Sequence, residues 1–216
     1  MIRVHDFTFN PFEEKTYVLF DETREAVIID PGCYDKEEQE ELASFIYTEK
    51  LTVKLLLNTH GHIDHVLGNY FVKQRYGAPF LIHSVEVPVL RSVKSYAPNY
   101  GFPGYQEVLP DSLLAEGTPI KFGKSQLDVL FLPGHSPGHV GFFAPEQHLL
   151  IVGDVLFYRS IGRTDLPGGN ADILLKSIHQ KLFQLPDEVV VYPGHGPTTT
   201  LGEEKVSNPF CALPVE

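Results

Sequence analysis

The segment 58–65 (NTHGHIDH) constrains this chain more than any other part of its sequence. It carries four potential metal ligands within six positions: His60, His62, Asp64 and His65. Imidazole nitrogens and carboxylate oxygens are the usual protein ligands of zinc and similar divalent metals. The preceding residues 53–57 form an apolar run of strand length, and residues 66–76 have the spacing of an amphipathic helix. Because open α/β sheets bind ligands in loops at the carboxyl ends of strands, this placement predicts a metal site.

The order of the ligands within the segment suggests how they are shared between ions. Alternate side chains of an extended loop point the same way, so His60 and His62 can share one ion. Asp64 and His65, at the turn into the helix, can face a second ion, although an aspartate there also fits a helix cap. These four side chains cannot complete two coordination spheres, so the interpretation requires further ligands elsewhere in the chain.

Three further candidate ligands each follow a predicted strand directly. They are His135 after the strand 127–132, Asp154 after 149–152, and His195 after 189–192. Glycine or proline flanks each of them, which permits tight turns and a close approach of the backbone. If these strand ends converge on one edge of a sheet, all three side chains can join the loop 58–65.

Two other residues are candidates for holding a ligand in place. Asp30 ends the buried strand 26–29, directly before Pro31 and Gly32. It can cap the turn, or it can hold the ring of a ligand histidine, and the sequence leaves both readings open. His139 lies close to His135 and is a weaker candidate for the same supporting role.

The pattern of elements predicts an α/β (α+β) fold in a single domain over residues 1–216, without a repeat or linker. Each half of the chain builds a strand-rich layer with helices outside it. This pattern indicates two sheets that face each other and are flanked by helices. We expect strands at 2–9, 15–20, 26–29, 53–57, 79–82, 119–122, 127–132, 140–144, 149–152 and 188–192, and helices at 36–49, 66–76 and 172–183, with a short last helix from 200.

Composition narrows the function. The formal net charge of −11 argues against a nucleic-acid-binding surface, which needs basic patches. Two cysteines, Cys33 and Cys211, lie far apart and do not suggest a disulfide framework. The chain has no signal-peptide pattern and no apolar run near the roughly 18 residues that a membrane span needs. We therefore expect a cytoplasmic protein without a membrane partner.

The ligands occur in an order that resembles the metallo-β-lactamase superfamily over essentially the whole chain: His60-x-His62-x-Asp64-His65, then His135, Asp154 and His195. The resemblance implies a four-layer αββα sandwich with a dinuclear metal site at one edge of the two sheets. Carried over position by position, it implies His60, His62 and His135 on one ion, Asp64, His65 and His195 on the other, and Asp154 bridging the two.

Three features are similar to the short glyoxalase II-like (hydroxyacylglutathione hydrolase-like) enzymes. Asp154 stands where one group of lactamases has cysteine, and the segments 162–165 (GRTD) and 208–210 (NPF) match. The resemblance implies that a metal-bridging hydroxide attacks a thioester of the S-acylglutathione type, with Asp64 and Asp154 as catalytic residues. Full-length relatives grip glutathione with a C-terminal helical domain, which we expect to be missing because 21 residues (216 − 195) follow His195.

Other interpretations stay open. Persulfide dioxygenases resemble this chain in fold and in the 162–165 segment, and that reading places one Fe(II) on His60, His135 and Asp154. A non-catalytic metal-binding module is a further alternative. The expected cofactors are two divalent ions, zinc first, with iron or manganese also suited to these ligands. Candidate contacts to a small-molecule substrate are Arg163, Tyr100 and Tyr105, although the tyrosines also fit ordinary packing of a long loop. The sequence does not indicate an oligomeric state.

Overall fold

The computed structural model describes residues 1–214, and the chain forms two compact units. Unit 1 comprises Met1–Leu114 and Ile120–Gln126. Unit 2 comprises Ala115–Pro119 and the chain from Leu127 onward. Each unit contains candidate metal ligands, so each is described separately.

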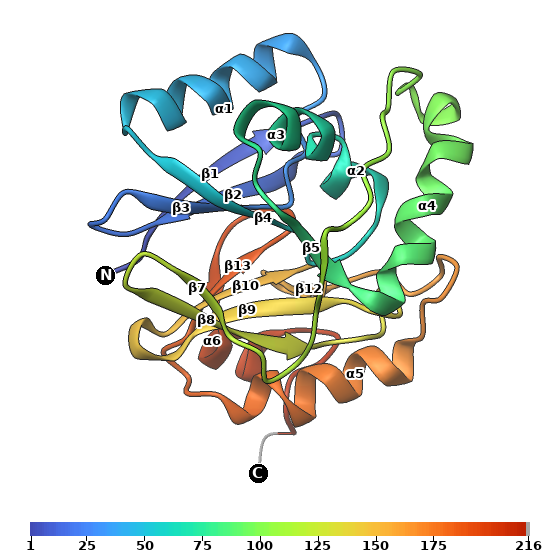
Figure 1. The fold of residues 1–216 in the computed structure, drawn as a ribbon. Helices are drawn as coiled ribbons and strands as arrows, with labels where there is room; N and C mark the ends of the chain where they lie inside the picture. The colour runs from blue at the N-terminus through green and yellow to red at the C-terminus, as the bar shows by residue number, and fades with distance from the viewer. Residues whose placement is uncertain (215–216) are drawn as a thin grey trace. The chain divides into compact units, whose positions relative to one another are not determined.

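The sheet of unit 1 contains both parallel and antiparallel strands, and the candidate metal ligands of this unit follow its parallel strands (Figure 1). Its six strands run in the order β1-β2-β3-β4-β5-β6, with β1–β3 antiparallel and β3–β6 parallel. Because β3, β4 and β5 run parallel, their carboxyl ends lie at one edge of the sheet. The strands are β1 Arg3–Phe9, β2 Glu14–Phe20, β3 Glu25–Ile29, β4 Thr52–Leu57, β5 Phe80–His83 and β6 Ser112–Leu114.

The helices of unit 1 form where caps and apolar spacing favour them. Helix α1 begins at a capping box, in which the Asp35 side chain accepts from the backbone of Glu38 and the Glu38 side chain accepts in return. It buries Leu42 and Ile46 in the core beneath the sheet. The helices are α1 Lys36–Thr48, α2 Ile63–Val66, α3 Asn69–Tyr76 and α4 Val87–Tyr96, with 3-10 turns at Ser84–Glu86 and Ala97–Tyr100.

The helix predicted over 66–76 is wrong in one respect, because the structure divides it into α2 and α3 at Gly68. The backbone N–H of Gly68 donates to the carbonyl oxygen of Pro31 at 2.7 Å. A Cβ at this position would meet the Sγ atom of Cys33 at 2.6 Å. The break therefore docks the helix that carries two ligands onto the turn that follows β3.

The second sheet, whose strands β9, β10, β13 and β14 belong to unit 2, also gathers strand ends at one edge. The order is β14-β13-β10-β9-β8-β7, in which β10 and β13 are parallel while β9 is antiparallel to both β8 and β10. It follows that β8, β10 and β13 end at the same edge, where β9 begins. The strands are β7 Ile120–Phe122, β8 Ser125–Phe131, β9 Val140–Ala144, β10 Leu149–Gly153, β13 Val190–Pro193 and β14 Thr199–Thr200.

Two helices cover one face of this second sheet. Helix α5 (Ala171–Gln180) contributes Leu174 and Ile178, and α6 (Leu201–Ser207) contributes Leu201, to a core shared with Leu150 and Val152 of β10. Both helices begin at side-chain caps, Asn170 for α5 and Thr200 for α6. A small hairpin, β11 (Leu156–Phe157) and β12 (Ser160–Ile161), follows the end of β10.

Most predicted elements are confirmed within one or two residues. The strands that precede candidate ligands end within one residue of the predicted positions, at Leu57, Phe131, Gly153 and Pro193. The prediction missed the short strands β6, β11, β12 and β14, which have two or three residues each and too little periodicity to recognise. The helix predicted over 172–183 ends at Gln180, and a 3-10 turn at Leu182–Gln184 replaces its last part.

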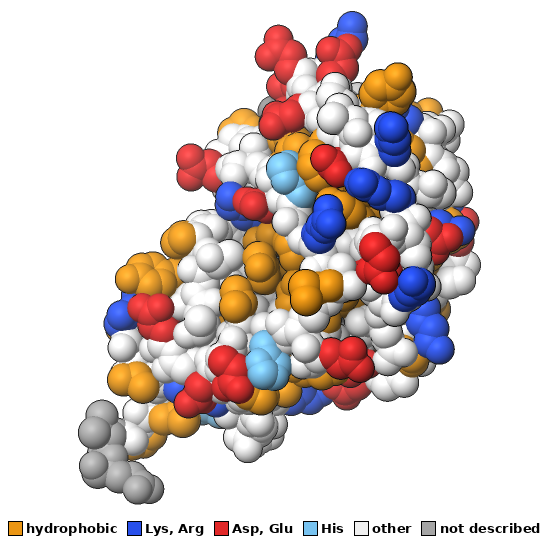
Figure 2. Space-filling model, turned by 90° about the vertical axis from the view of Figure 1, so that its left-hand side faces the viewer, with side chains coloured by type: hydrophobic (Ala, Val, Ile, Leu, Met, Phe, Trp, Pro, Cys, Tyr) orange, Lys and Arg blue, Asp and Glu red, His pale blue; other side chains and the backbone are white. Residues whose placement is uncertain are grey.

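On the face in Figure 2, basic side chains lie among acidic ones, and no continuous basic surface forms over the described residues there. No helix within residues 1–214 is long and apolar enough to cross a membrane.

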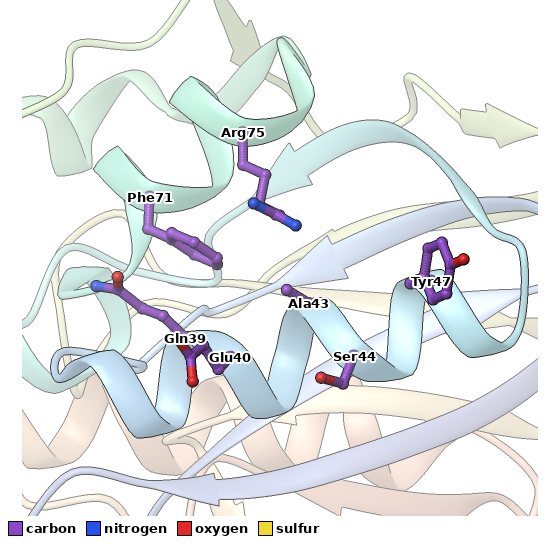
Figure 3. A pocket seen from close by; sticks show the side chains of 7 residues that line it. All are labelled: Gln39, Glu40, Ala43, Ser44, Tyr47, Phe71 and Arg75. Carbon is purple, nitrogen blue, oxygen red and sulfur yellow. The ribbon is translucent and has the colours of Figure 1, made fainter.

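A groove of about 310 Å³ lies between α1 and α3 (Figure 3). The side chains that line it include no histidine or cysteine: Gln39, Glu40, Ala43, Ser44, Tyr47, Phe71 and Arg75. The groove therefore does not compete with the strand ends as a metal site.

Asp21 joins two turns of unit 1 and supplies a test of its packing. One carboxylate oxygen accepts from the Thr23 backbone N–H at 2.8 Å and from its hydroxyl. The other accepts from the Lys124 backbone N–H at 2.7 Å and from the Ser125 hydroxyl at 2.8 Å. Burial opposes ionisation, but these hydrogen bonds outweigh it and lower the pKa of Asp21 to about 2.

We expect Asp21→Asn to lower the free energy of unfolding by about 1 to 2 kcal/mol at pH 7, because an amide nitrogen then faces two donors. The pKa of Asp21 is lower in the folded chain than its unfolded value of about 3.9. Its contribution is therefore complete above about pH 4 and disappears as the pH falls through about 2. Urea unfolding at several pH values measures this, and a difference that stays constant down to pH 2 contradicts it.

Candidate metal centre

In unit 1, the carboxylate of Asp30 organises the loop that follows β4. Asp30 is 2% exposed and lies directly after β3. Its Oδ1 accepts from the Thr59 backbone N–H at 2.7 Å and from the Asn58 amide at 3.2 Å. Its Oδ2 accepts from the Thr59 hydroxyl and lies 3.1 Å from Nδ1 of His65. Every polar contact of this buried carboxylate reaches the segment 58–65, called the ligand loop here, which includes the first residues of α2. Asp30 therefore does more than cap its own turn.

These contacts determine the tautomers of two candidate ligands. A carboxylate only accepts, so Nδ1 of His65 carries the hydrogen that faces Asp30. The Thr59 hydroxyl donates its single hydrogen to Asp30 and therefore accepts from Nδ1 of His60, at 3.0 Å. In both rings the lone pair then resides on Nε2. A neutral imidazole held through Nδ1 in this way is the form that ligates a metal.

Asp64 and His65 are spaced as ligands of one ion. Oδ2 of Asp64 lies 3.5 Å from Nε2 of His65. Two ligands about 2.0–2.1 Å from a tetrahedral zinc ion are about 3.4 Å apart, so the observed spacing fits a shared ion. Asn10 holds this end of α2, because its amide donates to the backbone carbonyls of Asp64 and Gly32, at 3.1 Å each.

The rings of His60 and His62 lie against each other at the other end of the ligand loop. Their centroids are 4.6 Å apart in a T-shaped arrangement. His60 is fully buried, while His62 is partly exposed. Potential ligating atoms of Asp30, His60 and His65 lie within 4.8 Å of one another, so the loop gathers its donors tightly.

A second acid, Glu14, lies beneath His65 and is also fully buried. Its Oε1 is 3.8 Å from Nδ1 of His65, and Thr16 places its hydroxyl 2.9 Å from both Oε2 of Glu14 and the carbonyl oxygen of Asp30. Burial raises the pKa of Glu14 well above its usual range, and the charges of Asp30 and Asp64 add to the effect while His65 opposes it. A protonated Glu14 donates its hydrogen to the hydroxyl oxygen of Thr16. The single hydrogen of that hydroxyl then points to the backbone carbonyl oxygen of Asp30.

In unit 2, one oxygen of Asp154 faces two candidate ligands. Oδ2 of Asp154 lies 3.6 Å from Nε2 of His135 and 3.5 Å from Nε2 of His195. Both distances again match the spacing of ligands on a shared ion. Asp154 and His195 follow the parallel strands β10 and β13, which are joined beyond their ends by the Gly194 N–H donating to the Gly153 carbonyl at 2.9 Å.

The backbone of the segment 162–165 supports this group. Nδ1 of His135 donates to the carbonyl oxygen of Arg163 at 2.8 Å, so Nε2 carries the lone pair, as in His60 and His65. Gly162 lies between Asp154 and His135, and a Cβ there would meet the Asp154 carbonyl oxygen at 1.9 Å. Only glycine fits this position. His139 is fully buried, and its Nε2 accepts from the Asp154 backbone N–H at 3.1 Å.

The three candidate substrate contacts differ in their exposure to solvent and in the residues they contact. Tyr100 is 57% exposed, and its ring lies 6.4 Å from that of Phe12. Tyr105 is partly buried with its hydroxyl inside the protein, and burial raises its pKa. The Arg163 side chain is exposed and makes a two-point ion pair with Asp165, and hydrogen bonds from Arg163 lower the pKa of Asp165 to about 2.

Sequence reasoning missed several residues that hold the ligands. Thr59 and Asn58 adjoin His60, so their position could have marked them. Glu14 and Asn10 lie between the predicted strands 2–9 and 15–20, and no local pattern distinguishes them from ordinary loop residues. Tyr96 is a further omission: burial, together with the nearby charge of Asp64, raises its pKa to about 12.

Comparison with known proteins supports a metal site at these residues. The metallo-beta-lactamase superfamily model matches residues 11–195. Hydroxyacylglutathione hydrolase GloC of Haemophilus influenzae is 39% identical over 201 residues, covering 92% of this chain and 93% of that protein. The crystal structure of BLEG-1 B3 metallo-beta-lactamase is 36% identical, with a TM-score of 0.88 over 98% of this chain and 99% of that one. TTHA1623 in a di-iron-bound form is 38% identical, with a TM-score of 0.85 over 96% and 100%.

The chain therefore belongs to the metallo-beta-lactamase superfamily, and it has that fold, with two mixed sheets flanked by helices and buried clusters of histidine and aspartate. Within the superfamily it is a metal-dependent hydrolase similar to GloC. The predicted fold class and family are confirmed. The donor set of each unit fits a divalent metal, since its histidines present Nε2 lone pairs beside aspartate oxygens. The choice of zinc stays a prediction.

We expect Thr59→Val to weaken metal binding about 10- to 100-fold, the usual effect of removing a residue that orients a ligand. The valine keeps the shape but takes the acceptor from His60 and a donor from Asp30. Zinc titration of the metal-free protein in competition with a chromophoric chelator measures the affinity. Thr8→Val, at an exposed position of β1, is the matched control. Equal affinity in the two variants contradicts the prediction.

Proposed function

We propose that this protein hydrolyses a thioester of the S-acylglutathione type at a dinuclear metal centre. The observation that carries the proposal is Oδ2 of Asp154, which faces both His135 and His195 as a bridging ligand would. The 39% identity to hydroxyacylglutathione hydrolase GloC supports the substrate class. The di-iron-bound relative TTHA1623 supports two ions.

We assign the ligands as the family resemblance implies: His60, His62 and His135 for one ion, Asp64, His65 and His195 for the other, and Asp154 for both. With one donor shared, these seven donors are enough for two four-coordinate sites.

When bound, such ions lower the pKa of water to about 7 and polarise a carbonyl group. The protein's own contribution is to hold the rings of His65, His60 and His135 through their Nδ1 atoms, by Asp30, Thr59 and the Arg163 carbonyl, so that Nε2 is left for an ion. Its negative charge at the ions comes from Asp64 and Asp154. The remaining positive charge suits an oxyanion developing on the substrate carbonyl. No nucleophilic side chain is required, and Cys33 does not qualify because burial raises the pKa of its thiol.

Substrate contacts are proposed for Tyr100 and Arg163. Phe12 and Tyr100 present aromatic surface in unit 1, and Phe12 lies two residues from Asn10, which contacts the Asp64 carbonyl. This surface suits an apolar part of an acyl group or thiol. Arg163 adjoins the residue that packs on Asp154, and its exposed guanidinium suits a substrate carboxylate that replaces Asp165 as its partner. Tyr105 is the weaker candidate because its hydroxyl lies inside the protein.

A β-lactam is the second candidate substrate. The similarity to BLEG-1 B3 metallo-beta-lactamase, at 36% identity over nearly the whole chain, favours including it. Both reactions add water to a polarised carbonyl, so the two candidates differ in the leaving group rather than in the role of the ligands.

We expect the metal-loaded protein to hydrolyse S-lactoylglutathione, and Asp154→Ala to lose bound metal and reduce kcat/KM by more than about 100-fold, beyond the effect of changing a supporting residue. Removing Asp154 takes away a donor that serves both ions. Metal quantification together with a thioester absorbance assay measures this, and a chromogenic cephalosporin measures the alternative.

Asp172→Ala, at an exposed position in the first turn of α5, serves as the control for removing an aspartate from unit 2. Full activity and full metal content in Asp154→Ala contradict the assignment of the centre. Faster turnover of the cephalosporin than of the thioester contradicts the substrate class but leaves the centre in place.

A further inference from the structure

Glu86 is a fully buried acid whose position in the chain gives no local reason for burial. It ends the 3-10 turn Ser84–Glu86 after β5 and occupies the N-cap position of α4. Its exposed fraction is 0%. Although it stands at an N-cap, its side chain makes no capping hydrogen bond to α4. Because burying a carboxylate is costly unless it is hydrogen-bonded, its contacts elsewhere in the unit matter.

The carboxylate of Glu86 contacts the ligand loop instead of its own helix. The backbone N–H of Gly61 donates to Oε2 of Glu86 at 2.8 Å. Gly61 is the residue between His60 and His62, so this bond holds the His60–Gly61 peptide, one of the two peptides between the histidines. A Cβ on Gly61 would meet the backbone nitrogen of Leu90 at 2.8 Å, which shows how closely the first turns of α4 approach this peptide.

The topology of the sheet explains the contact. Strand β4 carries the ligand loop and lies between its parallel neighbours β3 and β5. Asp30 follows β3 and accepts from the N–H of Thr59, while Glu86 follows β5 and accepts from the N–H of Gly61. Two buried carboxylates from opposite neighbours thus hold alternate peptides of the loop, one on each side of His60.

We propose that Glu86 is a positioning residue for the metal centre, and that its hydrogen bond to Gly61 sets the relative orientation of His60 and His62. The inference rests on the proposed role of these histidines as ligands of one ion. The bond is 2.8 Å long and lies inside the protein, where water does not compete for either partner, so it restrains the His60–Gly61 peptide. Without this hydrogen bond the loop becomes ordered only when the ion binds. The conformational entropy lost in that step lowers the affinity for the ion.

The test compares three substitutions by zinc affinity, measured on metal-free protein in competition with a chromophoric chelator. Glu86→Ala removes the acceptor, and we expect binding about 10- to 100-fold weaker. Glu86→Gln keeps a side-chain oxygen that can accept from Gly61, and we expect affinity within about threefold of wild type, because outright loss of an orienting contact costs at least about tenfold. Glu86→Asp, which retains charge but shortens the side chain, is expected to resemble alanine and serves if Glu86→Ala does not fold.

The control is Asp21→Ala. Asp21 is another buried carboxylate of unit 1 that accepts from backbone N–H groups, but it precedes β3, whereas Asp30 follows it. Urea unfolding of each metal-free variant reports stability separately, and the visible spectrum of the cobalt-loaded proteins reports ligand geometry. We expect Asp21→Ala to lose stability while retaining zinc affinity and the wild-type cobalt spectrum.

Three results would overturn the proposal: wild-type affinity in both Glu86→Ala and Glu86→Asp, equal weakening in Glu86→Gln and Glu86→Ala, or an equal loss of affinity in Asp21→Ala. Each leaves the proposed function standing, because the wild-type protein still binds zinc. Failure of the wild-type protein to bind zinc or cobalt would instead overturn the ligand assignment itself, and with it this inference.

Discussion

The carboxylate of Asp30 is the contact on which the arrangement of unit 1 depends. It is buried, so its charge is tolerated only because four donors face it, and all four belong to the ligand loop or the start of α2. The same contacts select the Nδ1–H tautomers of His60 and His65. One buried charge therefore gives the loop its conformation, its ligand chemistry and its attachment to β3.

Parallel strands make this arrangement possible, because neighbouring parallel strands end at the same edge of a sheet. In unit 1 this edge brings together residues that are distant in sequence: Asp30 after β3, the ligand loop after β4 and Glu86 after β5. In the second sheet the parallel neighbours β10 and β13 precede Asp154 and His195, and β8, which runs the same way across the antiparallel β9, precedes His135. The supporting contacts are backbone groups as often as side chains, as the Arg163 carbonyl and Gly162 show.

Much of the fold and most of the donor set were predictable from the sequence, for identifiable reasons. Strands such as β10 are buried along their whole length and read as continuous apolar runs, and the candidate ligands stand after such strands. The break at Gly68 was not predictable, because the apolar spacing continues across it and only the contacts with Pro31 and Cys33 require it. The short strands β11 and β12 depend on pairing with each other and leave no periodic signal.

The sequence by itself identified the candidate metal-binding residues, since ligand chemistry depends on residue type and on the order in which histidines and aspartates follow strands. It also determined the family, through the same order. Only the tertiary structure decided which residues hold those ligands. Glu14, Thr59 and Glu86 act through hydrogen bonds and burial, which depend on neighbours that are close in space but distant along the chain, and so their roles appear only once β3, β4 and β5 lie side by side.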